Sequence, residues 1–296
     1  MKLFGNKIPF FQKGRSETSP KQNKSKEDFN ARIAIFGDIH SNLEALTAVL
    51  ADANQQEITR FACTGDLVGY GANPSECLER VKALDCPLVK GNHDEYSATD
   101  ISLSDFTLNA MNSLIWTRQH LTPEERAWLD TLPLQKTIQT SNKEQETDPD
   151  HKSASSFFDS IHIVHSSVFE PQMWRYIIRQ EAAERVLPAQ QQKIVFFGHT
   201  HVPASYAFHP KTGAFKSVMP SRTGTLKLDP EWKWLINPGS VGQPRDKDPR
   251  AAYLIYDPVE SIVEQRRVEY DFKKTAKKIM KAQLPITNAK RLYIGK

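Results

Sequence analysis

The sequence contains few cysteines and no long apolar segment. Its three cysteines, Cys63, Cys77 and Cys86, form no C-x-x-C pair, so reduced thiols in a cytosolic protein are the expected state. No run approaches the roughly 20 apolar residues that a membrane-spanning helix needs. The first residues have no apolar stretch long enough for a secretory signal, and no internal repeat is evident. Together these absences predict a soluble cytoplasmic protein.

Positive charge is scarce in the middle of the chain and concentrated at its ends. The 296 residues have a formal net charge of +4, of which residues 1–29 carry +4 and residues 264–296 carry +7, leaving −7 between them. Solvated tails are the simple interpretation, and contact of the tails with nucleic acid or a membrane surface is the alternative. Residues 12–28 are rich in Lys, Ser, Asn and Gln, which predicts disorder. We therefore expect a disordered basic tail (1–29), one domain (30–285) and a C-terminal tail (286–296).

The first part of the chain alternates short apolar runs with helix-start signals. Strands are expected at 32–36, 58–64 and 87–89. Ser41 and Glu44 have the spacing of a capping box, and Asn73 followed by Pro74 marks the start of another helix. This order predicts a parallel sheet with helices packed outside it.

The rest of the chain becomes increasingly strand-rich. Helices are expected at 106–121, from 122 onward and at 273–280. Strands are expected at 160–165, 193–197, 203–208, 233–236, 251–256 and 261–270. Residues 139–156 resemble a polar insertion, and residues 209–231, which hold several Gly, Pro and Lys, are expected to form an extended hairpin or flap.

Four short polar segments follow apolar runs that are predicted as buried strands. They are Gly37-Asp38-Ile39-His40, Gly65-Asp66, Gly91-Asn92-His93-Asp94 and Gly198-His199-Thr200-His201. Because ligands in open α/β sheets bind beyond the carboxyl ends of the strands, these side chains are expected to converge. A carboxylate at such a buried position needs a partner, and a metal ion is an economical one. Asp and His without a thiolate suit Mn, Fe, Zn or a similar divalent ion.

A further histidine belongs with these segments. His162 and His165 share one predicted strand, and because side chains alternate along a strand they should point to opposite faces. His165 lies at the strand's end and is the expected ligand. For His199 and His201, a turn starting at Gly198 would bring both side chains to the metals more easily than a strand would.

Charge counting favours an anionic substrate. Two divalent ions, set against Asp38, Asp66 and a hydroxide, leave about one positive charge, which a neutral Asn92 preserves. A metal ion lowers the pKa of its bound water from 15.7 to about 7, so a hydroxide would be available without a protein base. Two ions roughly 3.5–4 Å apart could stabilise both oxygens of an in-line displacement.

In order and spacing these motifs resemble those of the calcineurin-like metallophosphoesterases. Two further segments, 65–71 (Gly-Asp-Leu-Val-Gly-Tyr-Gly) and 237–246 (Asn-Pro-Gly-Ser-Val-Gly-Gln-Pro-Arg-Asp), are similar to its small prokaryotic phosphodiesterase branch. The resemblance covers about 32–270. It implies an α/β fold, a four-layer αββα sandwich of two mixed β-sheets flanked by helices.

The resemblance also implies roles for individual residues. Asp38, His40 and His201 would bind one divalent ion. Asn92, His165 and His199 would bind the other, and Asp66 would bridge the two. His93 would protonate the leaving-group oxygen and Asp94 would orient His93. Mn²⁺ is the expected metal, with Fe, Zn, Ni or Mg as alternatives.

The chain departs from the family pattern at two places. Protein phosphatases and diadenosine tetraphosphatases carry Asp-Arg after the second motif, where this chain has Val68-Gly69-Tyr70. The branch often has Gly-Ser-Pro after the lone histidine, where this chain has Ser166-Ser167-Val168, which leaves the loop shape open. Arg245 is a candidate anion clamp, with a surface ion pair as the alternative. Asn42 and Tyr70 are candidate pocket residues, with capping and packing as equal alternatives.

The expected activity is hydrolysis of a phosphodiester, and less readily a monoester, by attack of a metal-bridging hydroxide. Small loops and no evident capping domain favour a small nucleotide-type phosphoester as substrate. A nuclease or protein phosphatase of the same superfamily is one alternative. A non-catalytic scaffold on the same fold is another.

Overall fold

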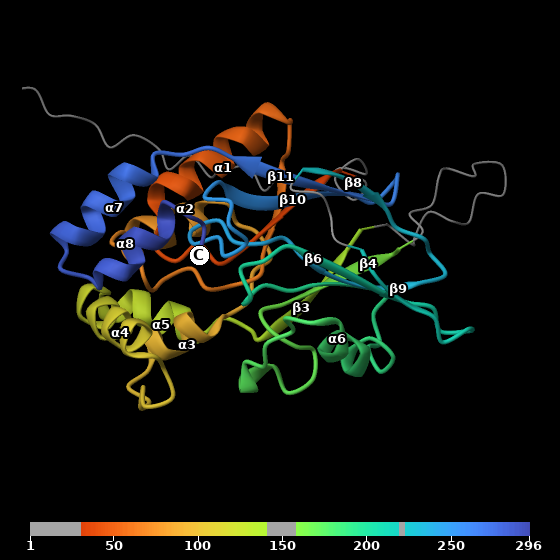
Figure 1. Cartoon of the computed structure of the whole chain (residues 1–296), viewed down its shortest axis with the longest axis horizontal. Coiled ribbons are helices and arrows are strands. Elements are labelled where there is room, and N and C mark those ends of the chain that lie inside the picture. The colour runs from red at the N-terminus through yellow and green to blue at the C-terminus, as the bar shows by residue number, and fades with distance from the viewer. Residues whose placement is uncertain (1–30, 141–157, 219–222) are drawn as a thin grey trace, which may run out of the picture.

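The computed structural model describes residues 31–140, 158–218 and 223–296 (Figure 1). The expected disordered tail (1–29) and residues 141–156 of the expected insertion lie outside the described residues. The described residues contain two β-sheets with helices around them.

The first sheet combines the two ends of the chain. Its strand order is β2-β1-β10-β11-β8. The strands are β1 (Ile33–Phe36), β2 (Arg60–Cys63), β8 (Gly224–Lys227), β10 (Ala251–Asp257) and β11 (Ile262–Val268). Strand β1 is parallel to β2 but antiparallel to β10, and β11 is antiparallel to both of its neighbours. The sheet is therefore mixed.

The second sheet comes from the middle of the chain. Its order is β3-β4-β5-β9-β6-β7. The strands are β3 (Gln135–Gln139), β4 (Ser160–Val164), β5 (Ile194–Phe196), β6 (Ala204–Phe208), β7 (Phe215–Ser217) and β9 (Lys233–Asn237). The central three, β4, β5 and β9, are parallel, and the outer pairs are antiparallel. The carboxyl ends of the parallel strands of both sheets carry the polar motifs.

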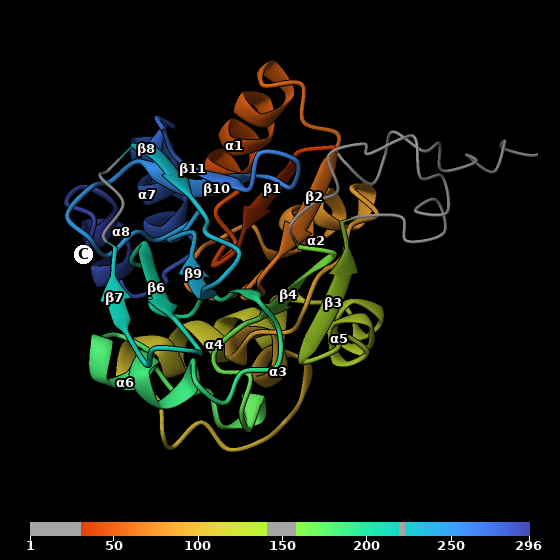
Figure 2. The same cartoon turned by 90° about the vertical axis from the view of Figure 1, so that its right-hand side faces the viewer.

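The two sheets pack face to face, and helices lie outside them (Figure 2). Strand β1 shows why: Ile33 and Ile35 face the second sheet, whereas Ala34 and Phe36 face the helices, as the twofold period of a strand requires. Burial on both faces explains why β1 is apolar throughout rather than alternating. The expected αββα sandwich of two mixed sheets is confirmed.

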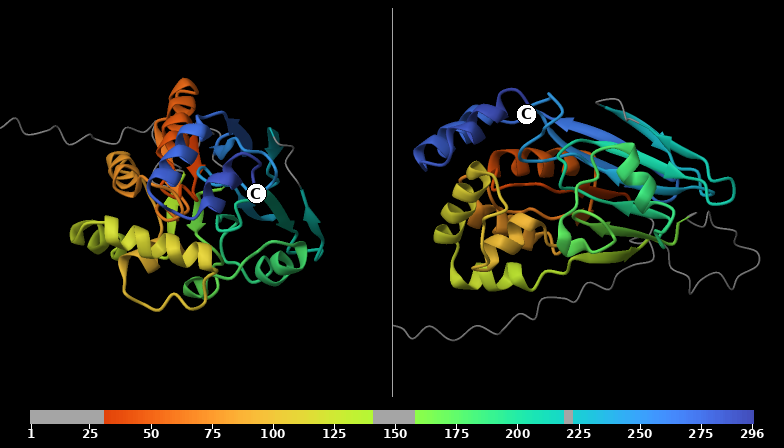
Figure 3. Two further views of the ribbon diagram at one scale, coloured as in Figure 1. Left: turned by 60° about the vertical axis from the view of Figure 1, so that its left-hand side comes forward. Right: turned by 60° about the horizontal axis from the view of Figure 1, so that its bottom comes forward.

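The helices fall into three groups. Helices α1 (Leu43–Gln55) and α2 (Pro74–Ala83) pack on the first sheet, and α6 (Gln180–Val186) packs on the second. Helices α3 (Asn92–Ala98), α4 (Leu108–His120) and α5 (Pro123–Asp130) follow one another below α2 in Figure 1. Helices α7 (Phe272–Lys281) and α8 (Ile286–Leu292) lie side by side, as Figures 1 and 3 show.

Several local expectations were wrong. Strands β7 and β8, within the expected hairpin at 209–231, do not pair with each other, because β7 pairs with β6 in one sheet and β8 pairs with β11 in the other. Residues 87–89 make only a single bridge, between Cys63 and Leu88, and no strand. Helix α1 is capped by Asn42, whose Oδ1 accepts a hydrogen bond from Ala45 N at 3.1 Å, and not by Ser41. Helices α3, α6 and α8 and strand β3 were not expected.

The C-terminal residues differ most from expectation. Residues 286–296 were expected to form a tail outside the domain, but 286–292 form α8, whose Ala289 and Leu292 are buried against α7. Asn288 adds two hydrogen bonds from its Nδ2, to Tyr70 O at 3.1 Å and to Ser113 Oγ at 2.9 Å. The apolar residues of α8 are too few for the helix to be recognised from the sequence.

Two simpler features concern the cysteines and the membrane. Cys63, Cys77 and Cys86 are all free, and the first two are buried. Among the described helices, none has both the length and the apolar character needed to cross a membrane.

Leu292→Ala should destabilise the protein, because Leu292 is 3% exposed in the cluster between α7 and α8. The expected loss is about 2 kcal/mol or more in the free energy of unfolding, measured by urea denaturation. Ile294→Ala is the matched control, since Ile294 is 52% exposed, and its effect should stay within about 0.5 kcal/mol. Equal effects of the two variants would show that this segment behaves as a tail.

Candidate metal centre

The loops after β1 and β2 run side by side and carry the first two motifs. Asp38 N donates a hydrogen bond to Gly65 O at 2.8 Å, and His40 N donates one to Asp66 O at 3.0 Å. These bonds continue the parallel pairing of β1 and β2 beyond the strands. Asp38 and Asp66 are therefore held at the same edge of the first sheet.

The second sheet supplies the remaining histidines. His165 follows β4, and His199 and His201 lie between β5 and β6. The loops are joined by Gly198 N, which donates to His165 O at 2.9 Å. His199 N donates to both carboxylate oxygens of Asp38 at 3.1 Å, which joins the two sheets at this edge.

Left-handed backbone turns these side chains toward one another. Five of the seven expected metal ligands have a positive φ: Asp38 (48°), His40 (47°), Asp66 (55°), His199 (70°) and His201 (61°). This conformation is uncommon outside glycine and costs on the order of 1–3 kcal/mol per residue, so its clustering points to a functional site. His199 and His201 lie in a turn after Gly198, as expected, and not in a strand.

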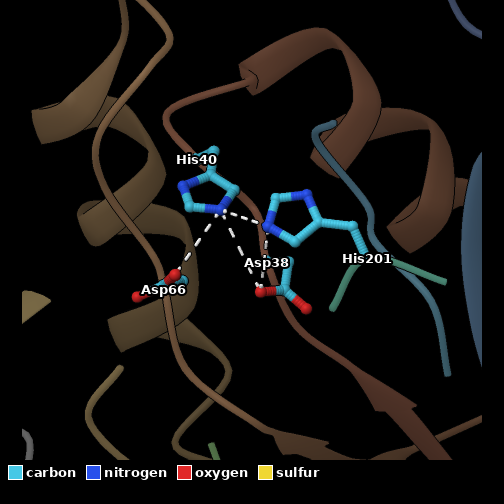
Figure 4. A group of neighbouring side chains, drawn as sticks. All are labelled: Asp38, His40, Asp66 and His201. Atoms are coloured by element: carbon cyan, nitrogen blue, oxygen red, sulfur yellow. Dashed lines mark hydrogen bonds and ion pairs between the residues drawn. The ribbon is translucent and has the colours of Figure 1, made fainter. Parts of the chain in front are cut away.

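The first group of converging residues consists of Asp38, His40, Asp66 and His201 (Figure 4). His40 Nε2 lies 3.0 Å from His201 Nε2 and 3.5 Å from Asp66 Oδ2. His201 Nε2 lies 3.5 Å from Asp38 Oδ1. One ligand atom from each residue lies within 4.8 Å of all the others, so the group could hold a metal ion.

The second group consists of Asp66, His165 and His199. His165 Nε2 lies 3.2 Å from His199 Nδ1 and 3.3 Å from Asp66 Oδ2. Asp66 belongs to both groups through the same oxygen, as the expected bridging role requires. His162 is separate from the centre: it is hydrogen-bonded to Thr137 and Gln135 of the neighbouring strand β3.

The hydrogen bonds of the four imidazoles test whether metal ions fit. His40 Nδ1 lies 3.0 Å from Val68 O and His201 Nδ1 lies 2.6 Å from Gln243 O. His165 Nδ1 lies 2.8 Å from Thr64 O, and His199 Nε2 lies 2.8 Å from Trp174 O. A carbonyl only accepts, so in each ring the nitrogen beside it carries the proton and the other nitrogen presents a lone pair.

The nitrogens that carry these lone pairs face each other in two pairs, His40 with His201 and His165 with His199. When both rings of a pair are neutral, two acceptors at 3.0 and 3.2 Å cannot hydrogen-bond to each other. A cation that both nitrogens bind resolves each contact, and carbonyl-oriented imidazoles are the usual arrangement around protein-bound metals. The residues therefore fit two metal ions that share Asp66.

The protonation states reflect a centre of buried charge. Burial lowers the pKa of His40 and His201 well below its usual value and that of His199 to about 3, so these rings are neutral. Burial acts in the same direction on His165, but the Asp66 carboxylate outweighs it and raises the His165 pKa to about 9. Burial raises the pKa of Asp38 to about 7. Bound cations would favour the carboxylate of Asp38 and the neutral form of His165.

Asn92 and His93 begin helix α3 and are buried beside the centre. Asn92 Oδ1 and His93 Nδ1 have no hydrogen-bond partner among the described residues, which is consistent with a ligand or substrate contact. The backbone leaves room for them: a Cβ on Gly69 would lie 2.4 Å from His93 Nδ1, and one on Gly91 would lie 2.1 Å from Asp66 Oδ1. Glycine is therefore required at both positions.

Asp94 does not hydrogen-bond to His93, so the expected orienting contact is corrected. Its Oδ1 accepts from the backbone N–H groups of Leu67 and Val68 at 2.8 and 3.2 Å, and its Oδ2 accepts from Gly91 N at 3.0 Å. Asp94 thus caps α3 and ties it to the loop that carries Asp66. His93 is held by aromatic neighbours instead, with its ring centroid 4.5 Å from that of Tyr70 and 5.8 Å from that of Phe106.

The three candidate substrate contacts differ from one another. Both polar atoms of Asn42 are used within the protein, Oδ1 by Ala45 N and Nδ2 by Gly242 O, so its role is capping. Tyr70 packs against His40 and His93. The Arg245 guanidinium lies over the Tyr70 ring at 5.7 Å. Arg245 forms no ion pair with any described residue, and its buried Nε has no partner there, so the surface ion pair that was the alternative is absent.

The contacts that Trp174 and Tyr176 of the 166–178 loop make with His199 were not expected from the sequence. After His165, Ser166 Oγ donates to Pro171 O and Ser167 Oγ accepts from Phe169 N, which gives a compact loop in place of Gly-Ser-Pro. This loop presents the Trp174 carbonyl to His199 and stacks the Tyr176 ring on it, with centroids 3.8 Å apart. A contact made by a backbone carbonyl cannot be predicted from the residue type. Only the aromatic residues Trp174 and Tyr176 could have suggested that this loop contacts the centre.

The chain is similar to known proteins over most of its length. A model of the calcineurin-like phosphoesterase superfamily domain matches residues 32–261. The uncharacterized protein MJ0912 of Methanocaldococcus jannaschii is 36% identical over 264 residues, which cover 89% of this chain and 98% of that protein.

Solved structures are similar as well. A metallophosphoesterase from Sphaerobacter thermophilus has a TM-score of 0.72 at 34% identity, covering 90% of this chain and 99% of that one. A hypothetical protein, PH1004, from Pyrococcus horikoshii has a TM-score of 0.69 at 19% identity with the same coverage, and is similar in fold. The chain belongs to the calcineurin-like phosphoesterase superfamily.

Proposed function

We propose that this protein is a two-metal phosphodiesterase that hydrolyses a small nucleotide-type phosphodiester. Two divalent ions, Mn²⁺ foremost, would be held by Asp38, His40 and His201 and by Asn92, His165 and His199, with Asp66 between them. The observation that carries the proposal is the pair of facing imidazole couples that share one Asp66 oxygen. The free cysteines fit a cytoplasmic location.

Bound divalent ions would supply a hydroxide nucleophile at neutral pH and offset negative charge on the phosphate. The protein's own contribution is to hold the ligands before substrate arrives. Each imidazole is oriented by a backbone carbonyl, and Asp66 is fixed through its Oδ1 by His93 N at 2.8 Å. Such pre-organisation keeps the reorganisation needed in the transition state small.

His93 is the proposed proton donor to the leaving oxygen. Its ring lies in the same aromatic cluster as His40 and Tyr70, and its Nδ1 has no partner among the described residues. Burial lowers the His93 pKa to about 4, so the ring is neutral before substrate binds. A negatively charged phosphate beside the ring would raise this pKa and favour the protonated donor.

Two features support a small diester over a phosphoprotein. The arginine that would follow the second motif in protein phosphatases is absent, and Arg245 lies over Tyr70 of that same loop. A cavity of about 280 Å³ beside the 166–178 loop is lined by Lys90, Glu95, Tyr96, Ile101, Leu134, Gln172 and Trp174. The backbone carbonyl of Trp174 contacts His199 Nε2, so this cavity lies near the second group of expected ligands.

With Mn²⁺ bound, the protein should hydrolyse bis(p-nitrophenyl) phosphate with a higher kcat/KM than p-nitrophenyl phosphate. Chelator-treated protein should be inactive and recover on addition of Mn²⁺. A preference for the monoester or for phosphopeptides would overturn the diester assignment, and a preference for single-stranded DNA would overturn the assignment of a small substrate. Metal-loaded protein without turnover on any phosphoester would indicate a scaffold.

His165→Gln should lose about one of two metal ions per chain, measured by elemental analysis of purified protein. Outer contacts alone change metal affinity 10–100-fold, and loss of a direct ligand should do at least as much. His162→Gln is the matched control, because His162 is buried on β4, three residues before His165, but hydrogen-bonded away from the centre. It should keep its metal content. Unchanged metal content in His165→Gln would contradict the ligand assignment.

His93→Asn should lower kcat by roughly 10²–10⁴-fold while the metal content stays constant. The loss should be larger for an alkyl ester than for a p-nitrophenyl ester, because a good leaving group needs little protonation. Steady-state kinetics on both esters measures this difference. Equal losses on the two would argue that His93 positions the substrate and does not donate a proton.

A further inference from the structure

Helix α8, which carries Arg291, lies beside the Arg245 loop, outside the metal centre. Asn288, one turn earlier on α8, donates to Tyr70 O at 3.1 Å, and residues three apart share a helix face. The Arg245 guanidinium lies over the same Tyr70. At the end of the chain, Lys247 N donates to Gly295 O at 2.8 Å, which ties the Arg245 loop to the segment after α8. The Arg245 side chain and the helix that carries Arg291 therefore both contact Tyr70.

These two arginines lack acidic partners. The nearby carboxylates of the loop are already used, Asp246 by Arg267 and Asp248 by Arg250. Within the described part of the chain, neither Arg245 nor Arg291 forms an ion pair. Burial lowers the pKa of Arg291, and the Arg245 charge adds to this. Two like charges placed side by side without a counter-ion repel each other, and an oxyanion bound between them would relieve the repulsion.

Backbone contacts relate the two arginines to the metal centre. Arg245 N donates a hydrogen bond to His201 O at 3.2 Å, so the Arg245 loop adjoins an expected metal ligand. Arg291 belongs to α8, which reaches the same region through the contact of Asn288 with Tyr70. Positive charge therefore continues from the metal centre along the Arg245 loop toward α8.

We propose that Arg245 and Arg291 form a second anion site, which binds a phosphate group that the substrate carries in addition to the phosphate being hydrolysed. This inference rests on the proposed function, because it assumes that the reacting phosphate lies at the metal centre. It narrows the substrate class to phosphodiesters with a further phosphate on one of their esterified groups.

The binding test uses metal-loaded full-length protein at fixed ionic strength and isothermal titration calorimetry. Wild type should bind adenosine 3′,5′-bisphosphate about tenfold more tightly than adenosine 5′-phosphate, because charge-assisted hydrogen bonds are among the strong ones. Arg291→Ala should remove this preference and Arg291→Lys should restore part of it. Lys290→Ala, a change of equal charge at an exposed neighbour on α8, should keep it.

Several results would overturn the site. One is that wild type shows no preference for the bisphosphate. Another is that Arg291→Ala keeps the wild-type preference. A third is that Lys290→Ala loses as much of the preference as Arg291→Ala does. A double-mutant cycle with Arg245→Ala adds a second measure, since additive effects of the two changes would show that the arginines do not bind one group.

A kinetic arm separates this inference from the proposed function. The substrates are p-nitrophenyl thymidine 5′-phosphate and the same ester with an additional 3′-phosphate. Arg291→Ala should lower kcat/KM about tenfold more for the second ester than for the first. If neither ester is hydrolysed but the calorimetric preference depends on Arg291, the proposed activity fails and the anion site stands.

Discussion

The shared Asp66 carboxylate is the contact on which the rest of the structure depends. One of its oxygens lies 3.5 Å from His40 and 3.3 Å from His165, and the other accepts from His93 N. It is buried, and burial alone would raise its pKa, but the surrounding histidines, His165 foremost, hold that pKa well below its usual value. A permanent negative charge at the junction of the two sheets thus requires positive charge around it, and the neighbouring side chains are arranged to accept cations.

The two sheets contribute to this centre in different ways. The first sheet supplies the carboxylates from loops that extend the β1–β2 pairing, and the second supplies three of the four imidazoles from the ends of β4 and β5. Face-to-face packing of apolar strands aligns the two edges. The site is therefore built on the buried core of the sandwich, which is the support that a pre-organised centre needs.

Much of this could be predicted from the sequence, and the failures have physical reasons. Strong apolar runs identified β1, β2 and the central strands, and the motifs identified which side chains would converge. The sequence could not show that Asp38 or His201 adopts positive φ, since neither is glycine, nor that carbonyls of Val68 and Gln243 would orient the rings. Helix α3 was not predicted, because Asp94, which caps it, was interpreted as a residue of the catalytic site. Helix α8 was missed because it depends on tertiary contacts with α7 and Tyr70.

The strand order β2-β1-β10 has a consequence for how the protein is made. Strand β1 has β2 on one side and β10, more than 200 residues later in the chain, on the other. During synthesis the growing chain must therefore keep one edge of β1 unpaired until residues 251–257 emerge. Such long-range closure slows folding and leaves an apolar edge open to other chains in the meantime. The His201 ring also cannot be oriented until late in synthesis, because the carbonyl to which it is hydrogen-bonded belongs to Gln243.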